Sequence, residues 1–134
     1  IGVYRMAYSY VCEPAAALPL FHFGPHTAQT SVYFPVLAAM EQCPDPLRRG
    51  TVAAIDRNAA YWTFRIVKHT ARGLPWDRCL TLIGERQQRW EGAAARILAD
   101  AQAGGGGDAA NLQAASAALH RFASEVVRDW WDLN

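Results

Sequence analysis

The stretch DRNAAYWTFRIVKHTAR, from Asp56 to Arg72, carries the clearest structural signal in this chain of 134 residues. Its small and apolar side chains recur at steps of four, three and four residues, which places them on one face of an α-helix: Ala60, Phe64, Val67 and Ala71. Asp56 is a favourable N-terminal cap, and Gly73 followed by Pro75 ends the segment. We therefore predict a helix over residues 56–72 with one buried face.

Two longer helices are predicted after this one. Residues 76–103 carry a stripe at near-heptad spacing, with Leu80, Ile83, Gln87, Trp90, Ala94, Ile97 and Ala101 as its members. The four glycines at 104–107 end that helix, and Asp108 suits the N-cap of another reaching to about residue 132. The second stripe consists of Leu112, Ala115, Leu119, Phe122, Val126 and Trp130. Two stripes joined by a flexible turn predict an antiparallel hairpin, with mutual burial of Leu80, Trp90, Ile97, Leu119 and Phe122.

The first 55 residues are predicted to be a β-rich segment of one sheet, whereas residues 56–134 are predicted to be helical. The segment from Ile1 to Val11 alternates as a strand does, with Tyr4, Met6, Tyr8 and Tyr10 on one face and Val3, Arg5, Ala7 and Ser9 on the other. Further strands are predicted at 20–23 and 30–38, separated by a Gly24-Pro25 turn, and residues 41–51 are predicted to be a loop. The expected class is α+β, with short antiparallel strands followed by three helices.

Composition narrows the range of partners. Thirteen basic and twelve acidic residues nearly cancel, which argues against a general nucleic-acid binder because such binding relies on neutralised phosphates. No apolar run approaches the about 18 residues that span a bilayer. We expect a soluble protein, in the cytoplasm or in a lysosomal or vesicular compartment, without a membrane span.

The residues that most often hold metals or form disulfides are widely spaced. Cys12, Cys43 and Cys79 are odd in number and form no C-x-x-C pair, so buried free thiols are the first interpretation and one bridge with one leftover thiol is the second. His22 and His26 lie four residues apart, but a Gly-Pro pair separates them and no third ligand stands nearby. We predict neither a metal nor a cofactor.

Three segments resemble the C-terminal part of the peptidase C69 family of dipeptidases, relatives of the secernins. They are TSVYFPVLA (residues 30–38), DRNAAYWTFRIV (56–67) and VVRDWWDLN (126–134), in that order. YRMAYSYV (4–11) and PLFHFGPHTAQTSVYFP (19–35) resemble the strands that precede them in the family. The resemblance covers nearly the whole chain.

This resemblance implies a part of the four-layer αββα sandwich of N-terminal nucleophile hydrolases, which use a processed N-terminal Cys as nucleophile and its own α-amino group as base. Ile1 is not such a residue, so residues 1–134 are expected to form one incomplete domain, with the nucleophile in upstream sequence or absent. Arg5 is the position that matches a strand arginine facing the nucleophile in related enzymes. Two interpretations of Arg5 are open, a catalytic residue and a charge at the rim of the strand.

Two functions follow from the resemblance. The first is the C-terminal segment of a cysteine dipeptidase that hydrolyses the peptide bond of small peptide substrates. The alternative is a catalytically inactive homologue that acts as a scaffold or interaction subunit in a larger assembly. In both cases we expect the partner to be the remainder of the same polypeptide or a companion chain that carries a second sheet, with a homo-oligomer as a further possibility.

Overall fold

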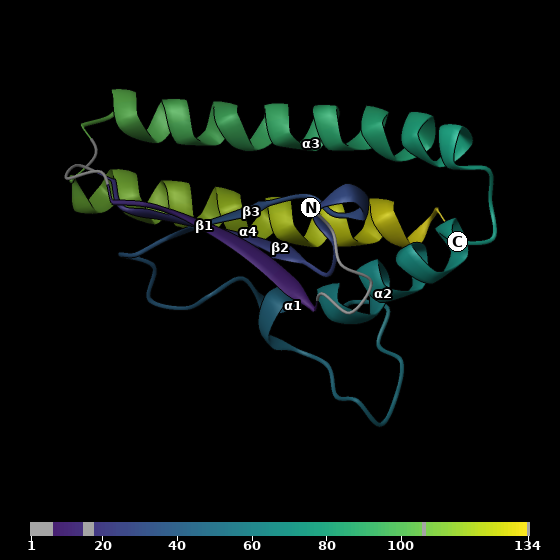
Figure 1. The fold of residues 1–134 in the computed structure, drawn as a ribbon. Coiled ribbons are helices and arrows are strands. Elements are labelled where there is room, and N and C mark those ends of the chain that lie inside the picture. Colours follow the sequence, from purple (N-terminus) through teal and green to yellow (C-terminus); the bar gives the residue numbers. More distant parts are fainter. Residues whose placement is uncertain (1–6, 15–17, 106, 134) are drawn as a thin grey trace.

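The computed structural model describes residues 7–14, 18–105 and 107–133 (Figure 1). Strands β1 (Tyr8–Glu13), β2 (Leu20–Pro25) and β3 (Phe34–Leu37) form an antiparallel sheet in the order β1-β2-β3. A 3₁₀ turn, η1 (Ala28–Thr30), lies between β2 and β3. The helices that follow are α1 (Asp45–Arg48), α2 (Ala60–Ala71), α3 (Trp76–Ala103) and α4 (Ala109–Trp131). The predicted α+β class with short antiparallel strands is confirmed.

Helix α4 is the centre of the fold, because it contacts α1, α2, α3 and β3. Figure 1 shows α3 running along one side of α4 and the sheet lying across α4. The aromatic core joins the β-rich part to the helices: the Phe34 ring lies 5.7 Å from Phe64 and 6.0 Å from Phe122. The Trp130 ring stacks on Phe64 at 5.3 Å and is fully buried.

The predicted helical hairpin is confirmed, and the turn residues explain its closed end. The Asp108 carboxylate accepts a hydrogen bond from the Asn111 backbone N–H at 3.0 Å, so Asp108 is the N-cap of α4. The Asn111 side chain in turn donates to the carbonyl of Ala101 at 2.5 Å, which fastens the start of α4 to the last turn of α3. A Cβ on Gly104 would lie 2.5 Å from the Asn111 side chain, so a larger residue here would have to displace that side chain from its hydrogen bond to Ala101.

The predicted burial of one residue in the stripe of α3, Leu80, is wrong. Leu119 and Phe122 are buried, and Trp90 and Ile97 pack against the core, but Leu80 is 50% exposed. The preceding residue, Cys79, is buried instead, and its thiol donates to the carbonyl of Ala71 at 3.3 Å. The turn between α2 and α3 is short, so the end of α2 decides which face of the first turn of α3 points inward.

The beginning of α2 also differs from the prediction. The helix starts at Ala60 with Ala59 as its N-cap, and Asp56 does not cap it. The Asp56 carboxylate accepts instead from the backbone N–H of Asn58 at 2.9 Å and from Arg49 Nε at 3.0 Å. Asp56 therefore forms a local turn that leads into the helix.

Glycine 24 and Pro25 belong to β2 rather than to a turn, which corrects the prediction. Gly24 pairs with Ser9, and a Cβ on Gly24 would lie 2.8 Å from the Ser9 Oγ. The glycine therefore serves a close approach between strands. The chain turns one residue after Pro25, at His26, whose φ is 59°.

The third strand is shorter than predicted, because helix side chains capture the carbonyls that precede it. The Thr30 carbonyl accepts from Trp130 Nε1 at 3.1 Å, and the Ser31 carbonyl accepts from Gln87 Nε2 at 2.7 Å. Thr30 and Ser31 consequently lie outside the hydrogen-bonded strand β3, which begins at Phe34. The segment 41–51, predicted to be a loop, contains α1, a helix of one turn.

Candidate functional site

One face of the sheet carries a ladder of four aromatic rings, which we call the aromatic ladder: Tyr8 and Tyr10 from β1, and Phe21 and Phe23 from β2. Tyr8 stacks on Phe23 at 6.0 Å and Tyr10 on Phe21 at 5.4 Å, with interplanar angles of 22° and 28°. These are diagonal neighbours in the register, where Tyr10 stands opposite Phe23. The alternation predicted for Tyr8 and Tyr10 is thus confirmed.

The aromatic ladder faces solvent. Tyr8 is 56% exposed and Tyr10 is 58% exposed, and the two phenylalanines are only partly buried. Among the described residues, the outer edge of β1 also lacks a strand partner. A flat aromatic surface beside an open strand edge is a surface that binds other protein well.

The opposite face of the sheet is covered by the helices. Leu20 and Leu37 stand opposite each other in the register and are both buried. They share a hydrophobic cluster with Ala101 of α3 and with Ala115 and Leu119 of α4. The sheet therefore has one face in the core and an aromatic face without cover among the described residues.

Arg5, the predicted catalytic residue, lies outside the described residues, as do Val3, Tyr4 and Met6. The structure describes this strand from Tyr8 to Glu13, so it extends two residues further than the predicted end at Val11.

The three cysteines are free, but only Cys79 is buried, so the expectation of three buried thiols is wrong for Cys12 and Cys43. Cys12 alternates with Tyr8 and Tyr10 and stands opposite Phe21, which places it on the ladder face. Although Cys43 is exposed, partial desolvation raises the pKa of its thiol, and the positive charge of Arg48 only partly offsets this.

The two closely spaced histidines have different surroundings. His22 Nε2 lies 3.5 Å from a Glu13 carboxylate oxygen, whereas the ring of His26 packs 5.2 Å from the ring of Tyr61. In residues 7–14, 18–105 and 107–133, no group of three or more His, Cys, Asp or Glu side chains has the arrangement of a metal site.

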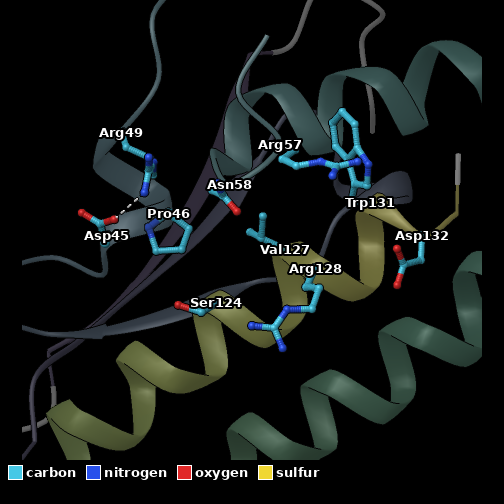
Figure 2. Close-up of a pocket in the computed structure, with 10 residues that line it drawn as sticks. All are labelled: Asp45, Pro46, Arg49, Arg57, Asn58, Ser124, Val127, Arg128, Trp131 and Asp132. Carbon is cyan, nitrogen blue, oxygen red and sulfur yellow. Dashed lines mark hydrogen bonds and ion pairs between the residues drawn. The ribbon is translucent and has the colours of Figure 1, made fainter.

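A cleft of about 470 Å³ opens between the C-terminal part of α4 and the segment that contains α1 and both ends of the loop before α2 (Figure 2). Ser124, Arg128, Trp131 and Asp132 reach it from the helix. On the other side it is bounded by Asp45, Arg49, Arg57 and Asn58. Pro46 and Val127 are buried and supply apolar surface.

Two of the arginines in the cleft differ in their partners. Arg49 binds the carboxylates of Asp45 and Asp56, each at 3.0 Å. The pKa of Asp56 is lowered first by the Asn58 N–H and then by the Arg49 hydrogen bond. Arg57 instead lies over the ring of Trp131, 5.2 Å from its centroid (Figure 2).

Sequence reasoning missed both the full ladder and the cleft. The alternation of LFHFGP contains a usable signal for Phe21 and Phe23, because residues two apart share a strand face. No local signal brings Arg57 to Trp131, since their contact depends on how α4 packs beside the loop before α2.

Comparison with known proteins identifies no relative: no family model, no curated protein and no solved structure matches this chain. In the part of the chain that the structure describes, none of the helices has the length and apolar character to cross a membrane.

Proposed function

We propose that this chain contributes the C-terminal sheet and helices of a cysteine dipeptidase resembling the C69 family. In this proposal it packs as one β layer and its covering helices in an αββα sandwich. The second sheet comes from the remainder of the same polypeptide or from a companion chain.

The observation that supports this proposal is the exposed aromatic ladder. A sheet whose one face is covered by helices and whose other face carries four aromatic rings suits face-to-face packing against a second sheet. Aromatic side chains gain much free energy from such burial, because each removes a large apolar area from water.

In the proposed reaction, a Cys at the N-terminus of the processed enzyme attacks the peptide carbonyl. Its α-amino group, with an ordinary pKa near about 7.7, accepts the thiol proton. The peptide C–N bond then breaks, the leaving amine takes the proton, and water hydrolyses the thioester. Arg5 is the residue of this chain that we place near the reacting groups, where a guanidinium stabilises the thiolate or holds the substrate carbonyl.

The direct test uses the native gene product, purified in the form in which it occurs in the cell. We expect N-terminal sequencing and intact mass to show a processed chain that begins with Cys. We also expect hydrolysis of a dipeptide panel that stops after alkylation with iodoacetamide. Replacement of that N-terminal Cys by Ala should abolish turnover without changing the melting temperature by more than a few degrees.

The three cysteines of this chain allow a second test of the same proposal. Replacing Cys12, Cys43 and Cys79 by Ser, one at a time, should leave dipeptide hydrolysis in place. A native product with no N-terminal Cys and no thiol-dependent hydrolysis would refute the dipeptidase and leave the alternative, an inactive homologue that acts as a scaffold subunit.

A further inference from the structure

We propose that the cleft between α4 and the segment before α2 binds the carboxylate group of a small organic acid or of a peptide C-terminus, with Arg57 and Arg128 as its cationic contacts. This inference is independent of the peptidase proposal, because it rests on the charges that line the cleft.

The size and lining of the cleft suit a small organic ligand. Its volume of about 470 Å³ is within the range typical of small-molecule sites. The buried side chains of Pro46 and Val127 offer apolar surface to the body of such a ligand. The carboxamide of Asn58 also lines the cleft and can donate or accept a hydrogen bond.

The cleft contains positive charge that its neighbours do not neutralise. Within residues 7–14, 18–105 and 107–133, neither Arg57 nor Arg128 has a carboxylate oxygen within 4.0 Å, whereas Arg49 binds two carboxylates. A guanidinium stays charged at all physiological pH values. An anionic ligand would therefore gain charge-assisted hydrogen bonds without breaking an existing ion pair.

Trp131 holds Arg57 in a favourable position for this task. The guanidinium carbon of Arg57 lies over the ring of Trp131, 5.2 Å from the ring centroid, and Figure 2 shows the two groups side by side. A cation–π contact of this kind attracts the charge of the guanidinium without consuming all five of its N–H donors. Arg128 projects from α4 one turn after Ser124, so both line the same side of the helix (Figure 2).

Two carboxylates limit which anions fit. Asp45 lines the cleft as the ion-pair partner of Arg49, whereas Asp132 has no Lys or Arg nitrogen within 4.0 Å among the described residues. The charge of Asp132 above all would therefore repel a polyphosphate or a nucleic-acid backbone. A ligand with a single negative charge meets the arginines with less repulsion. A carboxylate also matches the planar fork of a guanidinium, which can donate two parallel hydrogen bonds to it.

The experiment titrates three probes into the full chain and follows the indole Nε1–H signal of Trp131 by NMR. The probes are glycyl-leucine with a free carboxylate, the same peptide with a C-terminal amide, and acetate. We expect the free peptide to shift the signal in a saturable manner and the amide to bind at least tenfold more weakly. Saturable binding of acetate as tight as that of the peptide would identify a simple organic acid as the ligand, with the same carboxylate contacts.

Variants test the two arginines. Arg57→Gln and Arg128→Gln should each weaken binding by about tenfold or more, and Arg57→Lys, which keeps the charge and the contact with Trp131, should lose less. Arg96→Gln is the matched control, because Arg96 is exposed on α3 and does not line the cleft. Equal binding of the amide and the free peptide, tighter binding of inorganic phosphate, or equal losses in Arg57→Gln and Arg96→Gln would overturn the proposal.

Discussion

The indole of Trp90 in α3 donates a hydrogen bond to the Asp129 carboxylate in α4 at 2.8 Å, and the same oxygen lies 2.6 Å from Arg89 Nη2 and 3.5 Å from Arg86 Nε. One carboxylate near the C-terminal end of α4 thus connects that helix to the middle of α3. The ring of Trp90 also packs edge-on against Phe122, 5.8 Å away. Polar and apolar contacts therefore fix the hairpin at the same point.

Replacing Asp129 by Ala should lower the free energy of unfolding by about 1–3 kcal/mol, because the partly buried indole N–H loses its acceptor. Urea denaturation measures this difference. The control is Glu125→Ala, an exposed acidic residue of the same helix, which we expect to stay within about 0.5 kcal/mol of the parent. Equal effects of the two substitutions would contradict a structural role for Asp129.

Phe122→Ala should cost about 3–5 kcal/mol, the usual range for an aromatic side chain in a core. Phe122 is 3% exposed and contacts rings from α3 and β3. Leu80→Ala is the informative comparison, because the sequence stripe predicts a similar cost while the structure leaves Leu80 half exposed. We expect Leu80→Ala to lower the free energy of unfolding by less than about 1 kcal/mol, measured by the same denaturation. A cost near that of Phe122→Ala would show that Leu80 is buried, as the sequence stripe predicts.

Local signals in the sequence were enough to predict the long helices. α3 has the predicted bounds, and α4 begins directly after the cap at Asp108. Such features depend on residues within a few positions of one another, so a periodic pattern and a cap locate them. The stripe of α3 was one residue out of phase at its start because Cys79, not Leu80, meets the carbonyl of Ala71.

The parts that sequence reasoning missed depend on contacts between distant segments. Thr30 looks like a strand residue, yet its carbonyl accepts from Trp130 at the other end of the chain. Gly24-Pro25 looks like a turn, yet the glycine lets Ser9 and Tyr33 approach, with their hydroxyl oxygens 3.0 Å apart. The cleft arises in the same way, since its arginines come from segments that only tertiary packing brings together.

Thiol labelling should separate the three cysteines. In the chain alone, kept dilute enough to be monomeric, Cys12 and Cys43 should react with iodoacetamide, and Cys79 only after unfolding, because Cys79 is buried against Ala71. Cys43 should need a more alkaline solution than an ordinary exposed thiol, since partial desolvation raises its pKa and reduces the thiolate fraction at pH 7.5. Peptide mass spectrometry gives the rate at each site.

The same labelling probes the aromatic ladder in the native assembly. Cys12 lies on the ladder face, so a second sheet packed there should protect it, whereas Cys43 lies away from the sheet, beside α1, and should still react. Unchanged labelling of Cys12 in the native protein would argue against a covered ladder.

His69 should make the protein less stable in mild acid. His69 is exposed, but partial desolvation lowers its pKa below the ordinary value of 6.5, and the charges of Arg65, Lys68 and Arg72 lower it further. The unfolded chain therefore binds this proton at a higher pH than the folded protein, so stability falls as the pH drops through 6.5 towards the folded pKa. Thermal melts at pH 7.5 and 5.5 should show a smaller loss for His69→Gln than for the parent; an identical loss would exclude His69 as a contributor.

The last prediction concerns the behaviour of the 134 residues expressed by themselves, which we expect to self-associate. The cause is the aromatic ladder beside the open edge of β1, where Tyr8 and Tyr10 stay more than half exposed. The double substitution Tyr8→Lys with Tyr10→Lys should shift the chain towards monomer in size-exclusion chromatography with light scattering, because two like charges oppose stacking of ladder on ladder. Val52→Lys with Ile55→Lys is the matched control, since it adds the same charge to exposed apolar residues of the loop before α2 and should leave self-association unchanged. A monomeric parent with one sharp cooperative melt would show that the ladder tolerates water and that this sheet needs no second layer.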